Sequence, residues 1–116
     1  MEFTKREIRP GVVVLGMTGS IRVGPNCQQI EKALDELILQ DATWVVFDLN
    51  GVSFIDSAGI GSVVRALLKL NKLGGTLRLA GVKGQVQSAF NLTHIDRSIE
   101  IFPTADEAAA GLPLAA

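Results

Sequence analysis

The chain has 116 residues, of which 47% are hydrophobic and 20% are charged, and its net charge is −1. This length suits one domain and is too short for two ordinary domains. The hydrophobic content excludes a disordered chain, because enough apolar surface is present to offset the entropy of ordering. The balanced charge does not favour nucleic acid or an anionic membrane as a partner. We therefore expect a single domain over residues 1–116.

The sequence also lacks the usual marks of secreted, membrane-spanning and zinc-binding proteins. Cys27 is the only cysteine, so neither an internal disulfide nor a zinc site is expected. The first residues have no apolar core of the kind that a signal peptide needs. The longest apolar runs are far shorter than the roughly 20 residues that cross a bilayer. We expect a cytoplasmic protein that uses no metal and no other cofactor.

The first part of the chain predicts a β-hairpin followed by a helix. Residues 3–9 and 12–17 are predicted strands, joined by a turn at Pro10 and Gly11. A loop is expected over residues 19–26. Apolar residues then recur at helical spacing over residues 27–38, with Asn26 as the expected N-cap.

The middle of the chain predicts a buried strand that leads into a second helix. Residues 44–49 are almost continuously apolar, which is typical of a strand buried on both faces. A turn is expected at Asn50 and Gly51, before the short apolar segment 52–55. The second helix is predicted to begin at Asp56 or Ser57 and to end at the glycine pair 74–75.

The last third continues the alternation of strands and helices. A strand is predicted over residues 76–80, a helix over 85–92 and a short strand over 99–102. Thr104 and Glu107 form a capping box for a final helix. The predicted fold class is therefore α/β, with an N-terminal β-hairpin joined to a mostly parallel mixed sheet of about five strands and about four helices.

Most catalytic motifs are absent. His94 is the only histidine, Ser57 lies in no G-x-S-x-G motif, and no P-loop is present. Gly59 and Gly61 follow a strand as in a dinucleotide-binding loop, but the third glycine of that motif is missing. We therefore predict no enzyme activity and set a hydrolase aside. A small-ligand or nucleotide-binding domain is kept as one alternative.

The most informative segment is residues 54–61, where a short strand passes directly into a helix. Asp56 or Ser57 can cap this helix by accepting from its free N–H groups. Gly59 and Gly61 leave its first turn bare, although a glycine costs about 1 kcal/mol relative to alanine in a helix. Close approach of a protein or a phosphate would explain the two glycines, and so would close packing of the helix on the sheet. Ser57 is then either a phosphorylation site or an ordinary cap.

Residues 45–61 resemble the signature of the STAS domain, which occurs in bacterial anti-sigma-factor antagonists and in the cytoplasmic tails of sulfate transporters. The resemblance continues through residues 72–80, 90–92 and 99–102 to the acidic and alanine-rich segment 106–108. Residues 17–19 also resemble the first glycine turn of the family. The resemblance therefore covers nearly the whole chain. Without a membrane span, it implies a stand-alone antagonist and not a transporter tail.

The resemblance implies a switch controlled by phosphorylation. Stand-alone members bind an anti-sigma factor that is also a serine kinase, and this binding releases the sigma factor. The kinase then phosphorylates the Asp-Ser block, which ends binding, and a metal-dependent serine phosphatase reverses the modification. Ser57 is accordingly the expected phosphoacceptor and Asp56 its acidic neighbour. The expected partner-binding residues are Asp56, Ala58, Gly59, Ile60, Gly61, Arg65 and Arg22. Lys69 is expected to line the same contact face.

Two residues depart from the family pattern. Ala58 occupies the second position after the aspartate, so only Ser57 can accept the phosphate. Arg22 replaces an aspartate that usually stands near the phosphorylation site, which reverses the local charge. We expect Arg22 to stabilise phosphorylated Ser57 or to form a salt bridge to Asp56, the alternative being an arginine that points to solvent. These departures leave open an interaction or scaffold module without phosphorylation, and the oligomeric state is left open as well.

Overall fold

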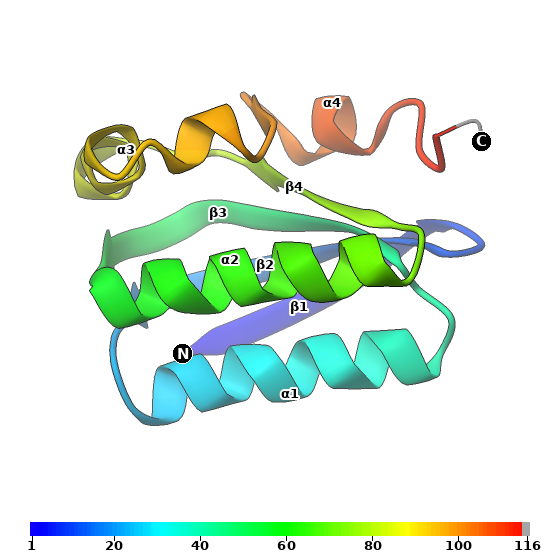
Figure 1. Cartoon of the computed structure of the whole chain (residues 1–116), viewed down its shortest axis with the longest axis horizontal. Helices are drawn as coiled ribbons and strands as arrows, with labels where there is room; N and C mark the ends of the chain where they lie inside the picture. The colour runs from blue at the N-terminus through cyan, green and yellow to red at the C-terminus, as the bar shows by residue number, and fades with distance from the viewer. Residues whose placement is uncertain (115–116) are drawn as a thin grey trace.

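The computed structural model describes residues 1–114 and contains one five-stranded sheet with the strand order β1-β2-β3-β4-β5 (Figure 1). β1 and β2 pair antiparallel, and all other neighbours pair parallel. The predicted α/β class with an N-terminal hairpin is therefore confirmed. The strands are β1 (Glu2–Arg9), β2 (Val12–Ile21), β3 (Trp44–Ile55), β4 (Thr76–Ala80) and β5 (Ile101–Phe102).

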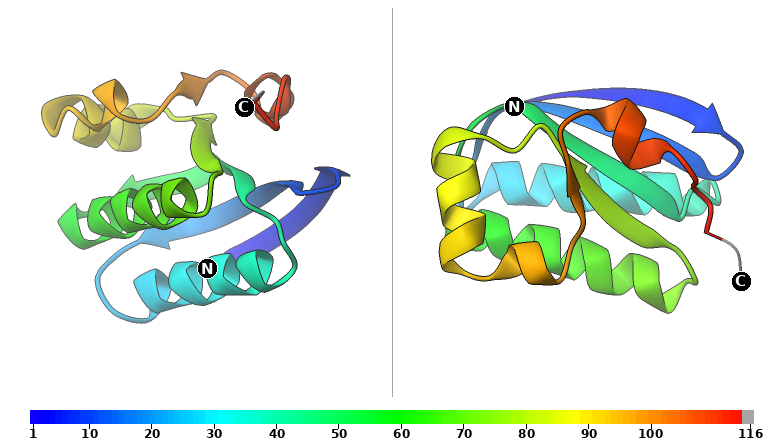
Figure 2. Two further views of the ribbon diagram at one scale, coloured as in Figure 1. Left: turned by 45° about the vertical axis from the view of Figure 1, so that its right-hand side comes forward. Right: turned by 90° about the horizontal axis from the view of Figure 1, so that it is seen from above.

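Helices cover both faces of the sheet. α1 and α2 pack side by side on one face, and α4 lies on the opposite face (Figure 2). α3 lies beside the end of β3, where Val86 and Phe90 join the core that α1 and α2 share with the sheet. The helices are α1 (Pro25–Leu39), α2 (Ser57–Lys72), α3 (Gly84–Leu92), the short 3₁₀ turn η1 (Ile95–Arg97) and α4 (Ala105–Ala109).

None of the helices within residues 1–114 has the length and apolar character needed to span a membrane.

The first helix begins earlier than the sequence predicts, and Asn26 is not its cap. Gly24 occupies the N-cap position and Pro25 is the first helical residue. Proline suits this position because its ring sets a helical φ and its missing N–H would have no partner there. The side chain of Asn26 instead donates to the carbonyl of Ser20, which ties α1 to the end of β2.

The expected turn at Asn50 and Gly51 is also wrong, because β3 continues without a break to Ile55. β2 pairs with β3 over this whole length, with register shifts between Gly16 and Thr18 and between Gly19 and Ser20. A side chain at Gly51 would lie 2.8 Å from the hydroxyl of Thr18. The glycine is therefore needed for the close approach of two strands and not for a turn.

Gly59 allows α2 to pack tightly on the sheet. A Cβ atom at this position would lie 2.6 Å from the carbonyl oxygen of Ile21 and 2.7 Å from the side chain of Ile55. Close packing thus accounts for Gly59. At Gly61 an added Cβ would meet only the flexible end of Arg65, at 3.3 Å.

Gly59→Ala and Gly61→Ala should therefore differ in sign. We expect Gly59→Ala to lower the free energy of unfolding by about 1–3 kcal/mol, since it overpacks a backbone contact. Gly61→Ala should raise the free energy of unfolding by up to about 1 kcal/mol, because alanine is the better helix former. Urea unfolding of both variants measures the difference, and equal effects would contradict this packing argument.

Candidate functional site

Asp56 lies between β3 and α2 and caps α2. The sequence predicts either Asp56 or Ser57 as this cap. Its Oδ1 atom accepts from the Gly59 N–H at 2.8 Å, and its carbonyl oxygen accepts from the Ile60 N–H at 3.0 Å. The extended backbone of Asp56 is typical of an N-cap residue. The alternative, that Ser57 is the cap, is wrong.

Asp56 also ties the start of α2 to the end of β2. Its Oδ2 atom accepts from the Val23 N–H at 2.9 Å, and its own N–H donates to the Ile21 carbonyl at 3.1 Å. The pKa of Asp56 lies below its ordinary value, chiefly because the Gly59 N–H donates to the carboxylate and secondarily because the Val23 N–H does so. Asp56 is therefore ionised at neutral pH.

Ser57 is the first residue of α2 and is exposed. Because Asp56 supplies the cap, the Ser57 hydroxyl is not needed for one. Of the neighbouring serines, Ser62 is only 1% exposed and accepts from Arg65, whereas Ser53 is exposed and donates to the carbonyl of Gly19. Ser57 thus combines an exposed hydroxyl with a position at a helix N-terminus.

Arg22 directly follows the last residue of β2 and does not form the predicted salt bridge. Its guanidinium group stacks on the ring of Phe54, 4.1 Å from the ring centroid, and no ion pair joins it to Asp56 within residues 1–114. The side chain is exposed, yet the stacking on Phe54 orders it. Its charge still contributes to the lowered pKa of Asp56, as the smallest of the causes.

Arg65 and Lys69 lie farther along α2 and pair with α1. Arg65 contacts Glu31 at 3.1 Å, and Lys69 contacts Asp35 at 2.7 Å. These two ion pairs bridge a shallow groove of about 190 Å³ between the helices. Arg65 and Lys69 therefore line the groove between α1 and α2, and both lie further along α2 than Ser57.

Sequence reasoning missed Gln85, the second residue of α3. Its side-chain amide donates to the Ile55 carbonyl and accepts from the Ile55 N–H, both at 2.9 Å. Ile55 is the residue directly before Asp56. Nothing in the local pattern marks Gln85, because its partner lies thirty positions earlier in the chain.

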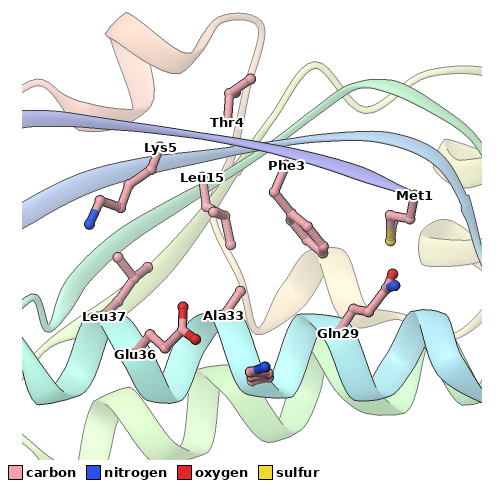
Figure 3. Close-up of a pocket in the computed structure, with 10 residues that line it drawn as sticks. Met1, Phe3, Thr4, Lys5, Leu15, Gln29, Ala33, Glu36 and Leu37 are labelled. Atoms are coloured by element: carbon pink, nitrogen blue, oxygen red, sulfur yellow. The ribbon is translucent and has the colours of Figure 1, made fainter.

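A separate hollow of about 370 Å³ lies between β1 and α1 (Figure 3). Phe3, Leu15 and Ala33 line its apolar part, and Lys5 and Glu36 lie toward its edge. None of the predicted site residues borders it. Among residues 1–114, no group of three histidine, cysteine, aspartate or glutamate side chains is placed to hold a metal ion.

Comparison with known proteins identifies the family of the chain. The family model of the STAS domain matches residues 4–108, so the chain belongs to the STAS domain family, as the resemblance in sequence implied. A candidate anti-sigma factor antagonist from Thermotoga neapolitana is 28% identical over 74 residues, which is 64% of this chain and 66% of that protein. The aligned segment thus spans just under two thirds of that relative.

Solved structures of similar fold include anti-sigma factor antagonists. The crystal structure of a candidate anti-sigma factor antagonist from Thermotoga maritima has a TM-score of 0.82 and 27% identity, covering 91% of this chain and 90% of that one. The anti-sigma factor antagonist SpoIIAA in its unphosphorylated form has a TM-score of 0.72 at 21% identity, covering 93% and 94% of the two chains. SpoIIAA from Bacillus is also known in a phosphorylated form, with a TM-score of 0.71, 22% identity and coverage of 92% and 96%. At this identity SpoIIAA supports the fold alone.

The role of the Asp56 carboxylate can be tested by its pH dependence. Because the native pKa is lowered, the ionised group stabilises the fold fully above the unfolded pKa of about 3.9, and this stabilisation is lost as the pH falls through the native pKa. Asp56→Asn should therefore be less stable than the wild type at pH 7, and the difference should shrink below pH 4. Urea unfolding from pH 7 to pH 3 measures it, and a constant difference would contradict the assignment.

Proposed function

We propose that this chain is an anti-sigma-factor antagonist that binds an anti-sigma factor through the surface around residues 56–61 and loses that binding when Ser57 is phosphorylated. The observation that carries the proposal is that Asp56 and Ser57 have different roles. The Asp56 side chain accepts from the N–H groups at the start of α2, and the exposed Ser57 hydroxyl remains accessible to a kinase. The names of the relatives support the antagonist role.

Electrostatics explain how one phosphate would end binding. A phosphoserine adds a charge of about −1.5 to −2 at neutral pH. On Ser57 this charge would stand beside the ionised carboxylate of Asp56, which already accepts from the Gly59 N–H. The helix start would change from a nearly balanced surface into a strongly negative one. Because Ser57 is exposed, the fold itself need not rearrange.

Two further proteins belong to this proposal. The anti-sigma factor would itself be the serine kinase, so that binding and phosphorylation use the same surface, and a serine phosphatase would restore the unmodified chain. Ala58, Ile60 and Gly61 surround Ser57 on the first turn of α2 and would make the contact. Gly59 is buried and would act by letting the helix pack.

Arg22 gives this chain a feature of its own within the switch. Its backbone is next to Val23, whose N–H bonds Asp56, the residue directly before Ser57, and from this we infer that the long side chain can reach a phosphate on Ser57. In the unmodified chain the guanidinium lies on Phe54. We propose that phosphorylation draws Arg22 toward the phosphate, because a charge-assisted hydrogen bond is stronger than an exposed cation–π contact.

The second candidate function is an interaction module of the same fold that is never phosphorylated. The replacement of the usual aspartate by Arg22 favours it, since this replacement changes the charge beside Ser57. A nucleotide-binding role is less well supported, because the Asp56 carboxylate occupies the helix start where a nucleotide phosphate would bind.

Mass spectrometry of the chain from its native host tests the proposal directly. We expect one phosphate on the peptide that contains Ser57, removed by phosphatase treatment and absent from Ser57→Ala. Ser53→Ala is the matched control and should keep the phosphate, since this serine lies in β3. A chain that never carries phosphate on Ser57 would favour the unphosphorylated module.

The role of Arg22 can be read from the phosphoserine itself. If Arg22 pairs with the phosphate, Arg22→Asp should raise the second pKa of phosphorylated Ser57 by about half a unit or more. Phosphorus NMR during a pH titration measures this pKa. Arg97→Asp, the same charge change in η1, should leave the pKa unchanged, and equal values for the two variants would contradict the pairing.

A further inference from the structure

The last part of β3 lacks a strand neighbour on one side. β4 pairs with β3 only as far as Ala80, which lies opposite Asp48. β3 then continues to Ile55, with β2 alone as its paired strand. The backbone groups along the other edge of this extension therefore need partners from elsewhere in the chain.

The start of α3 takes the place of the missing strand. At its N-cap, the Lys83 ammonium donates to the side chain of Asn50 at 3.1 Å. Two residues further on, the Gln85 amide makes its two 2.9 Å bonds to Ile55, one as donor and one as acceptor. A side-chain amide that bonds both the N–H and the C=O of one residue reproduces the pairing of an adjacent strand.

These two hydrogen bonds between Gln85 and Ile55, here called the clamp, lie where the chain passes from β3 to the candidate site. Ile55 is followed directly by Asp56 and Ser57. Val86 and Phe90 are fully packed in the core, at 1% and 0% exposure, so α3 provides a fixed support. The strand end is thereby held from both sides, by the Ile21 carbonyl bonding Asp56 and by Gln85 bonding Ile55.

We propose that Gln85 is a positioning residue for the phosphorylation of Ser57: its clamp on Ile55 holds the strand end in the conformation that presents the Ser57 hydroxyl to the kinase. This inference rests on the proposed function. Gln85 itself is exposed, so its substitution leaves no cavity in the core. Its effect passes through Ile55 and not through contact with the reacting atoms.

Loss of the clamp should change recognition more than chemistry. Without Gln85, the strand end samples several conformations, and only a fraction of the chains presents Ser57 correctly at any moment. The chain concentration that gives half-maximal phosphorylation then rises in proportion, while the rate at saturation stays the same. Loss of the two hydrogen bonds of the clamp, each with a modest net contribution because the freed groups bond to water instead, corresponds to a rise of about fivefold or more.

The test compares three variants of the full chain. Gln85→Ala removes the clamp. Gln85→Glu keeps the length and the acceptor but sets a carboxylate against the Ile55 carbonyl, so it tests hydrogen bonding separately from packing. Gln87→Ala is the matched control, an exposed glutamine of the same helix two residues further on.

Two measurements are needed for each variant. Hydrogen exchange of the Ile55 amide, followed by NMR, reports whether the clamp exists. Labelling with radioactive ATP in a clarified extract of the native host, at increasing chain concentrations, gives the half-maximal concentration and the saturating rate for Ser57. Thermal unfolding is recorded beside them to show that all variants fold.

We expect Gln85→Ala to exchange the Ile55 amide faster, because the acceptor of that N–H is removed, and both Gln85 variants to need about fivefold more chain for half-maximal labelling. Gln87→Ala should be unchanged in both measurements. Faster exchange with unchanged labelling would overturn the inference, because the clamp would then be only structural. Unchanged exchange in Gln85→Ala would overturn it as well. Absence of label on wild-type Ser57 would contradict the proposed function and the inference together, whereas equal labelling of wild type and Gln85→Ala contradicts the inference alone.

Discussion

The hydrogen bonds of the Asp56 carboxylate organise the whole region around Ser57. One oxygen caps α2 at Gly59, and the other holds the loop at Val23. Both bonds come from backbone N–H groups, which lower the pKa of Asp56 more than the nearby Arg22 charge does, and Asp56 is ionised at neutral pH. As a result a negative charge lies next to Ser57 at neutral pH, and the Ser57 hydroxyl is not needed to cap α2.

This arrangement depends on the unequal lengths of the central strands. β3 extends past the end of β4 and brings the start of α2 to the carboxyl-terminal edge of the parallel sheet. That edge is where open parallel α/β sheets usually bind their ligands. Gly51 and Gly59 make the extension possible, because the first lets β2 approach β3 and the second lets α2 approach β2. The start of α3 then supports the edge of β3 that β4 leaves bare.

Arg22 alters the electrostatics of this edge without disturbing its geometry. Its stacking on Phe54 keeps the cation near Asp56 but outside the hydrogen bonds of the cap. An arginine held in this way is free to exchange one weak contact for a stronger one when a new anion appears. The cations farther along α2, Arg65 and Lys69, are instead committed to ion pairs with α1.

The sequence alone determined the fold class, the order of the elements and the Asp56–Ser57 junction, because these follow from local periodicity, capping chemistry and a nearly continuous family signature. It misplaced the cap of α1 and put a turn at Asn50 and Gly51, because a glycine required by a neighbouring strand has the same local pattern as a turn glycine. Only the tertiary structure decided that Asp56 and not Ser57 is the cap, that Arg22 lies on Phe54, and that Gln85 clamps Ile55. Each of these contacts depends on which groups meet in the folded chain. The sequence does not show which of several similar polar residues reaches a given partner.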